Sequence, residues 1–129
     1  MTATNPVGRL DIVVYDCPDA RALAGFYAAL LGREVLDAAD DWVTLSTDGA
    51  GGPKLAFQRV DGYQPPRWPS RRHPQQMHVD VQVSDLATAA QSALGLGARA
   101  VSEVFAADST PWRVFVDPVG HPFCLVTEG

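Results

Sequence analysis

The chain has few of the features that mark specialised classes of protein. Among its 129 residues only Cys17 and Cys124 are cysteines, and they do not form a Cys-x-x-Cys motif. This pattern excludes a zinc ribbon and a disulfide framework, and it is typical of reduced thiols. No apolar run approaches the roughly 20 residues that span a bilayer, and residues 1–9 lack the basic and apolar regions of a signal peptide. We therefore expect a cytoplasmic protein with no membrane partner.

The chain also has no excess of positive charge. Ten Lys and Arg stand against fifteen Asp and Glu, which gives a formal net charge of -5. A protein of this charge cannot displace counterions from a phosphate backbone, so we expect no nucleic-acid partner. The hydrophobic fraction is 47%, which is enough for one ordinary folded core.

Motifs of two enzyme classes are missing as well. No Gly-x-Ser-x-Gly elbow is present, and no glycine-rich loop precedes a predicted helix. The glycine-rich segment 48–53 joins two predicted strands, so we interpret it as a hairpin connection rather than a phosphate loop. Hydrolase and nucleotide-binding functions are therefore not indicated.

Hydrophobic periodicity predicts the same order of elements twice. The first half is expected to form a strand, a helix and three strands over residues 10–15, 19–31, 34–37, 41–46 and 54–60. The second half is expected to form the same series over residues 77–83, 86–94, 99–101, 112–116 and 122–126. We place Pro18 in the first turn of the first helix and expect glycines to end both helices.

Internal similarity supports a duplication. Asp19 and Gly32 correspond to Asp85 and Gly97 at a shift of about 65 residues. We expect an α+β fold with one domain over residues 1–129. Two βαβββ modules over residues 7–60 and 76–129 are joined by a proline-rich linker, residues 61–75.

Three segments carry a resemblance to a known superfamily. They are Phe-Tyr-Ala-Ala-Leu-Leu-Gly at 26–32, Met-His-Val-Asp at 77–80 and Asp-Pro-Val-Gly-His-Pro-Phe at 117–123. With the repeated βαβββ order they resemble the vicinal oxygen chelate superfamily, which includes glyoxalase I, extradiol dioxygenases and bleomycin-resistance proteins. The proline-rich linker and the His-Pro-Phe-Cys-Leu ending are similar to its glyoxalase-like domains. The resemblance implies a curled mixed sheet in which each module forms half of a cup.

The resemblance also implies where metal-dependent members hold a divalent ion. The ligand positions lie on the first and last strands of each module. Here they fall at Ile12, at His78, at Cys124 and at one of Ala56, Phe57 or Gln58. Only His78 is a strong inherited donor, so we expect no cofactor and no metal. In the alternative, Cys124 and Asp80 join His78 in a mixed donor set that zinc or iron tolerates.

A polar stripe on the strand at 77–83 suggests a ligand site. His78, Asp80 and Gln82 alternate with three valines, so they share one face of the strand. This face either lines the cup or is exposed to bulk solvent. The repeat places Ile12 and Val14 at the positions equivalent to the first two of these residues. We predict a pocket between the modules with the polar trio on one wall. The facing and capping residues are expected to be Ile12, Val14 and Cys124, with Trp68 near the mouth.

Several of these residues have two interpretations. If a reaction occurs, His78 is the best general base and Asp80 orients it. Cys124 is expected to be a buried apolar side chain rather than a nucleophile, because no cation stands near it in the sequence. Trp42 and Trp112 fit either the core or the cup wall. Tyr63 and Trp68 fit either a ligand cap or a dimer contact. The remaining His73 and His121 are expected in a solvated loop and in a turn.

These observations lead to a principal functional hypothesis and two alternatives. The first is a homodimeric protein that holds a small, partly aromatic or amphipathic molecule in its cup without a metal. The second is a metal-dependent lyase, isomerase or dioxygenase. The third is a domain whose cup serves only as a surface for a partner.

Overall fold

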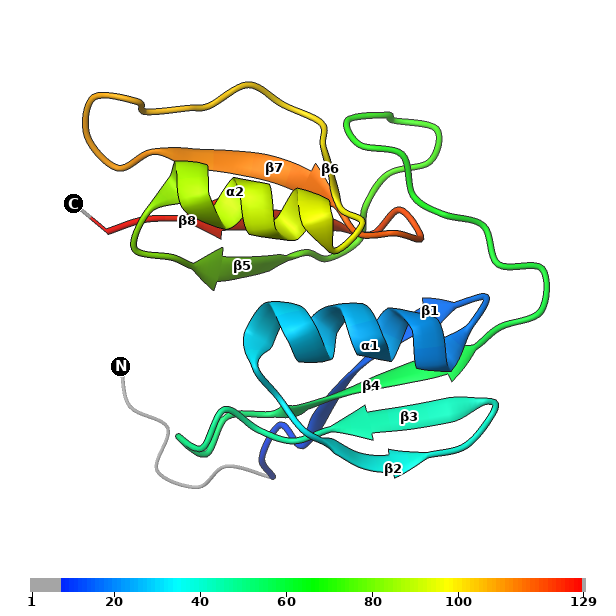
Figure 1. The fold of residues 1–129 in the computed structure, drawn as a ribbon. Helices are drawn as coiled ribbons and strands as arrows, with labels where there is room; N and C mark the ends of the chain where they lie inside the picture. The colour runs from blue at the N-terminus through cyan, green and yellow to red at the C-terminus, as the bar shows by residue number, and fades with distance from the viewer. Residues whose placement is uncertain (1–7, 129) are drawn as a thin grey trace. The chain divides into compact units, whose positions relative to one another are not determined.

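The computed structural model describes residues 8–128, which form two compact units that divide between Asp61 and Gly62 (Figure 1). The first unit contains β1 (Ile12–Cys17), α1 (Ala20–Leu31), β2 (Val35–Ala38), β3 (Trp42–Leu45) and β4 (Lys54–Arg59). The second contains β5 (Val79–Gln82), α2 (Leu86–Gly95), β6 (Arg99–Ala100), β7 (Trp112–Val116) and β8 (Pro122–Val126). The expected α+β fold of two βαβββ modules is confirmed.

Each unit has one four-stranded mixed sheet with the same topology. The strand orders are β1-β4-β3-β2 and β5-β8-β7-β6. The first strand of each module runs parallel to the last strand, and the other pairs are antiparallel. Both sheets bring the module's first and last strands side by side at one edge.

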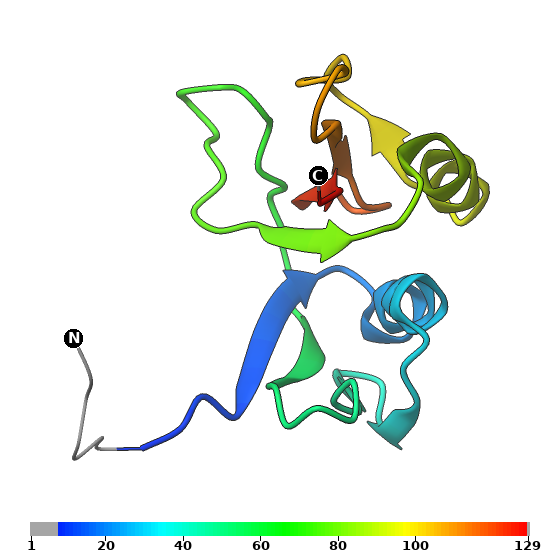
Figure 2. The ribbon, with the colours of Figure 1, turned by 90° about the vertical axis from the view of Figure 1, so that its left-hand side faces the viewer.

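Helix α1 covers one face of the first sheet (Figure 2). Its N-cap is Asp19, whose carboxylate accepts a hydrogen bond from Ala22 N at 3.1 Å. The helix therefore begins at Ala20, and Pro18 precedes it instead of lying in its first turn as expected. Gly32, with φ of 65°, ends the helix in the left-handed conformation that glycine adopts at little cost.

The core of the first unit lies between α1 and its sheet. Tyr15 of β1, Tyr27 of α1 and Phe57 of β4 are buried, and their ring centroids lie 4.8 to 5.6 Å apart. The register of β1 on β4 places Val14 beside Ala56 on the opposite face of the sheet. The two faces of this sheet therefore differ, one aromatic and packed under the helix and the other mixed.

The second unit repeats this design with a smaller helix. Asp85 caps α2 by accepting a hydrogen bond from Thr88 N at 2.9 Å. The helix includes Gly95, which was expected to stop it, and the chain turns at Gly97, where φ is 110°. Phe115 of β7 and Phe123 of β8 stack at 5.7 Å in the core of this unit.

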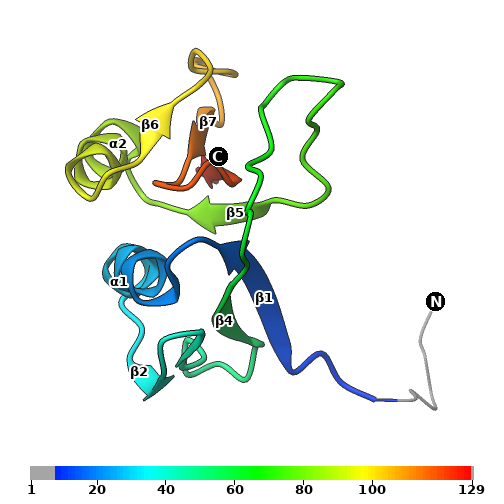
Figure 3. The ribbon, with the colours of Figure 1, turned by 90° about the vertical axis from the view of Figure 1, so that its right-hand side faces the viewer.

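The proline-rich segment belongs to the second unit and leads into β5 as a long loop (Figure 3). Tyr63 anchors this loop, because its hydroxyl donates to Val119 O at 3.2 Å and lies 3.2 Å from His121 Nε2. The same turn between β7 and β8 also approaches the loop closely at Gly120, where an added Cβ would lie 2.8 Å from Pro65 Cβ. The sequence did not indicate this anchoring role of Tyr63.

Among residues 8–128, neither helix has the length and apolar character needed to cross a membrane.

Candidate functional site

The polar stripe of the second module lies at the start of β5. Asp80 and Gln82 are exposed on this strand, whereas Val79 and Val81 are half-buried on its other face. The strand is shorter than expected, so His78 directly precedes it instead of lying within it. The predicted alternation of polar and apolar side chains is nevertheless present.

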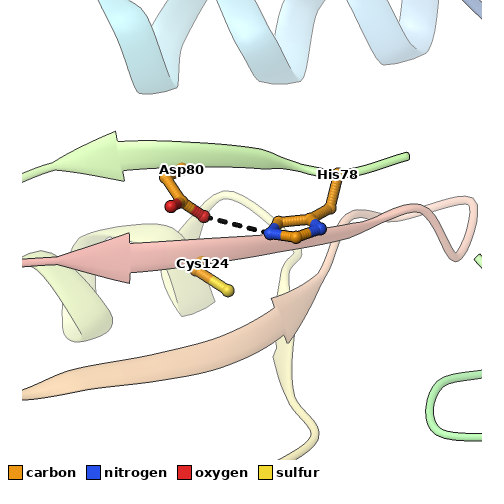
Figure 4. Close-up of side chains that lie close together, drawn as sticks. All are labelled: His78, Asp80 and Cys124. Atoms are coloured by element: carbon orange, nitrogen blue, oxygen red, sulfur yellow. Dashed lines mark ion pairs between the residues drawn. The ribbon is translucent and has the colours of Figure 1, made fainter.

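Three side chains of this unit come together on that face (Figure 4). His78 Nε2 lies 3.3 Å from Asp80 Oδ1, and the two side chains are 44% and 56% exposed. Cys124 of β8 is the register partner of Asp80, because β5 and β8 pair in parallel. Potential ligand atoms of the three residues all lie within 4.8 Å of one another. We call this group the His78–Asp80–Cys124 cluster.

The Cys124 thiol is the least reactive member of the cluster. Burial, and after it the charge and hydrogen bond of the Asp80 carboxylate, together raise the pKa of the Cys124 thiol to about 11. Only about one thiol in ten thousand is then ionised at neutral pH. Because the thiolate is the nucleophile, Cys124 does not act as one in this setting.

The cluster does not fit a preformed transition-metal site. A tetrahedral zinc ion at its usual bond lengths holds its ligand atoms roughly 3.3 to 3.8 Å apart. The donors here are spread over as much as 4.8 Å, and one nitrogen of His78 faces Asp80. A metal would also have to displace the proton from Cys124, whose raised pKa opposes this. Metal binding would require the side chains to rearrange.

The remaining residues of the expected pocket lie on other elements. Ile12 and Val14 lie on β1 in the first unit, next to Lys54 and Ala56 of β4, and Val14 is 42% exposed. Trp68 is half-buried in the proline-rich loop of the second unit. That these residues and the His78–Asp80–Cys124 cluster enclose one pocket stays a prediction.

The register of β4 removes one of the ligand alternatives in the first module. Phe57 is fully buried in the aromatic core under α1, so it has no place on the other face of the sheet. Ala56 and Gln58 lie on that other face, beside Val14 and Asp16. Neither is a strong metal ligand, so the first module adds no strong donor at these positions.

The same face of the first sheet carries a polar group that sequence reasoning missed. Trp42 and Thr44 of β3 lie opposite Gln58 and Ala56 of β4, and the indole Nε1 of Trp42 donates to Thr44 Oγ1 at 2.9 Å. Trp42 therefore lies on the face away from α1, where its ring is half-buried. No signal in the sequence pointed to Thr44, because the register between β3 and β4 was needed to place it.

Comparisons with known proteins agree with this architecture. The sequence profile of the glyoxalase-like domain matches residues 12–126. The chain therefore belongs to the glyoxalase-like domain family. No curated protein sequence matches it significantly.

Solved structures with the same fold include proteins named as glyoxalase-related enzymes and as an oxidase. A glyoxalase/bleomycin resistance protein/dioxygenase family enzyme from Burkholderia phytofirmans PsJN superposes with a TM-score of 0.74 at 14% identity, over 93% of this chain and 98% of that chain. A glyoxalase-related enzyme from Fulvimarina pelagi superposes with a TM-score of 0.71 at 16% sequence identity, over 95% of this chain and 89% of that chain. The oxidase ChaP-H2 superposes with a TM-score of 0.64 at 20% sequence identity, over 96% of each chain. Likeness at these identities establishes the fold alone.

Proposed function

We propose that this protein binds a small organic molecule without a metal, and that the polar face of β5 is one wall of its site. The observation that carries the proposal is the exposed His78–Asp80 pair beside a protonated Cys124 thiol. These groups offer hydrogen-bond donors and acceptors, whereas a metal site would need deprotonated ligands converging on one point.

The remaining surfaces favour a ligand that is partly apolar. We propose that the predicted apolar residues Ile12, Val14 and Trp68 complete this pocket, with Cys124 as a small apolar side chain. A polar wall facing apolar side chains suits a partly aromatic or amphipathic molecule better than a sugar. If the bound molecule also reacts, His78 is placed to take a proton, and Asp80 holds the imidazole in position.

One observation favours a second candidate function, that of a metal-dependent lyase, isomerase or dioxygenase. The His78–Asp80–Cys124 cluster contains three different donor types within 4.8 Å. Zinc or iron would accept such a mixed set once the thiol lost its proton and the side chains moved inward. In that case the metal would supply Lewis-acid or redox chemistry, and these three residues would hold it.

We further propose that the protein is cytoplasmic and forms a homodimer. Cys17 and Cys124 are both buried and form no disulfide, as is typical of a reducing compartment. The edge strand β2 is exposed throughout, with Val35 and Leu36 more than half exposed, and a second copy would cover such an edge. Light scattering of the purified protein measures its oligomeric state.

A ligand screen on matched variants tests the proposed function. Thermal-shift screening of small metabolites and antibiotics identifies a ligand, and titration calorimetry then measures its affinity for the wild type and for His78→Ala and Asp80→Asn. We expect each substitution to weaken binding about tenfold or more, because it removes a charged or hydrogen-bonding contact. Unfolding stability should change little, since both side chains are about half exposed.

A second exposed pair on the chain provides the control. Arg21 and Asp40 also form an exposed ion pair, at 3.4 Å, and neither belongs to the proposed pocket. Arg21→Ala and Asp40→Asn should leave ligand affinity unchanged. If His78→Ala and Asp80→Asn instead cost about 2 kcal/mol or more of unfolding stability and leave affinity intact, these residues form a structural network and the proposed site is wrong.

A further inference from the structure

The first unit contains a cleft that the proposed function does not use. Its volume is about 470 Å³, within the range of small-molecule sites, which is roughly 300 to 1,000 Å³. Its lining includes residues 9–11, where the chain enters β1, and Thr47, Gly51 and Gly52 of the β3–β4 loop. Lys54, the first residue of β4, completes the lining.

Two cations, Arg9 and Lys54, and one carboxylate, Asp11, line this cleft, and the Asp48 carboxylate lies close to Gly52. Arg9 forms no ion pair with any residue between 8 and 128, so its guanidinium group remains available to a ligand. Lys54 Nζ lies 3.4 Å from Asp11 Oδ1, but these side chains are 33% and 75% exposed. Such a solvent-exposed pair is weak, so an incoming anion can compete with Asp11 for the ammonium group.

A third cation holds the wall of the cleft in place. Arg33 Nη1 donates to Ser46 O at 3.3 Å and to Pro53 O at 3.2 Å. These two carbonyls lie at the two ends of the β3–β4 loop, so the guanidinium group ties the ends together and adds its positive charge behind the loop. The two ends of the loop are therefore held together without a ligand, which reduces the entropic cost of binding.

The loop also leaves hydrogen-bond donors unused. Thr47 Oγ1 accepts from the N–H of Gly49 at 3.2 Å, and the Asp48 carboxylate accepts from the N–H of Ala50 at 2.9 Å. The next two N–H groups, those of Gly51 and Gly52, have no partner in the part of the chain that the structure describes. An added Cβ at Gly51 would have nothing within 4 Å, so an anion can approach the backbone there, whereas the Asp48 carboxylate lies 4.0 Å from such a position at Gly52 and would have to turn away.

We propose that this cleft binds a small molecule through a carboxylate or phosphate group, with Arg9 and Lys54 as its charged contacts. The N–H groups of Gly51 and Gly52 and the hydroxyl of Thr47 supply neutral donors. Asp11 is the competing anion, which predicts that its removal strengthens binding. The proposal is independent of the β5 site, and it is compatible with the hairpin role of segment 48–53, because that role uses other groups of the loop.

Calorimetric titration of the full chain at constant ionic strength tests this proposal. The probes are inorganic phosphate, phenyl phosphate and benzoate. We expect saturable binding that Arg9→Gln and Lys54→Gln each weaken about fivefold or more, since each removes one charge-assisted contact. Asp11→Asn should have the opposite effect and tighten binding several-fold, because it removes the carboxylate that competes with the ligand. Arg99→Gln removes an exposed cation of the second unit, outside this cleft, and should have no effect.

The pattern across probes and variants decides the outcome. Equal affinity for inorganic and phenyl phosphate supports the site and assigns it to the free ion, whereas tighter binding of phenyl phosphate or benzoate assigns it to an organic anion. The proposal fails if no probe saturates. It also fails if Arg99→Gln weakens binding as much as Arg9→Gln, because binding would then reflect overall charge only. An unchanged affinity in Asp11→Asn would contradict it as well, because Asp11 would then not compete with the ligand for the Lys54 ammonium group.

Discussion

At the scale of single residues, Asp80 is the centre of the candidate site. It contacts His78 at 3.3 Å on one side and lies opposite Cys124 in the parallel pair of β5 and β8. Its carboxylate is hydrated as well as paired, because the side chain is 56% exposed. Its negative charge therefore lies next to both the imidazole of His78 and the thiol of Cys124.

The effect of Asp80 on Cys124 leads to a test of pH dependence. Burial is the main reason that the pKa of Cys124 is about 11, and the Asp80 charge comes second. Asp80→Asn should therefore lower this pKa while leaving it above the value of a free thiol. The thiolate fraction at a given pH then rises, so alkylation of Cys124 between about pH 8 and about pH 10 should become faster.

The measurement uses a Cys17→Ala background, in which Cys124 is the one remaining thiol. Mass spectrometry follows the rate of alkylation as a function of pH. Asp108→Asn removes an exposed carboxylate outside the cluster and serves as the control. An unchanged pH profile for Asp80→Asn would show that Asp80 does not act on the thiol.

At the scale of elements, the proline-rich loop is held by the turn between β7 and β8. Gly120 has a φ of 101°, and an added Cβ would lie 2.8 Å from Pro65 Cβ. Asp117 shapes the same turn, since its carboxylate accepts from the N–H groups of Val119 and His121 at 2.9 and 3.0 Å. The loop and this turn therefore depend on each other.

Gly120→Ala should separate the loop from the turn. The substitution adds a clash with Pro65 to a backbone conformation that L residues rarely adopt, so we expect a loss of about 1 to 3 kcal/mol of unfolding stability. Gly25→Ala is the matched control. Gly25 lies in α1 with nothing within 4 Å of an added Cβ, and helix propensity predicts a gain of about 0.5 to 1 kcal/mol. Urea denaturation measures both values, and equal effects of the two substitutions would contradict the proposed contact.

Local sequence patterns were sufficient for most elements and for part of the site. The bounds of β7 and β8 equal the predicted ones, because apolar runs there end at prolines and at a tight turn. Alternation along β5 predicted that His78 and Asp80 share a face. The family resemblance had already placed Cys124 near them, but neighbours without such a resemblance, such as Thr44 beside Ala56, required the register. Local patterns cannot specify register, because it depends on how whole strands pack.

The cleft in the first unit illustrates a different limit. Arg9, Thr47 and Lys54 are distant in sequence and share no spacing that a motif could express. They meet because β1 and β4 run parallel from the same edge, with Ile12 beside Lys54. The unused donors of the glycine-rich loop depend on which N–H groups its own side chains occupy. This arrangement is a property of the folded unit.

At the scale of the whole molecule, the two modules share one topology and differ in chemistry. The second module carries the His78–Asp80–Cys124 cluster, whereas the equivalent first strand of the first module carries Ile12 and Val14. At the ligand positions that the family resemblance implies, the first module therefore offers no strong donor. Membership of the glyoxalase-like domain family is therefore consistent with binding as well as with catalysis.

The metal content of the protein as purified without added metal tests this account most directly. Inductively coupled plasma mass spectrometry of the wild type and of His78→Ala measures zinc, iron, manganese and nickel per chain. The account predicts far less than one equivalent of each in both proteins, because one imidazole paired with a carboxylate and a protonated thiol cannot compete with water and buffer for a divalent ion. About one equivalent in the wild type that is lost in His78→Ala would contradict it and support the metal-dependent enzyme.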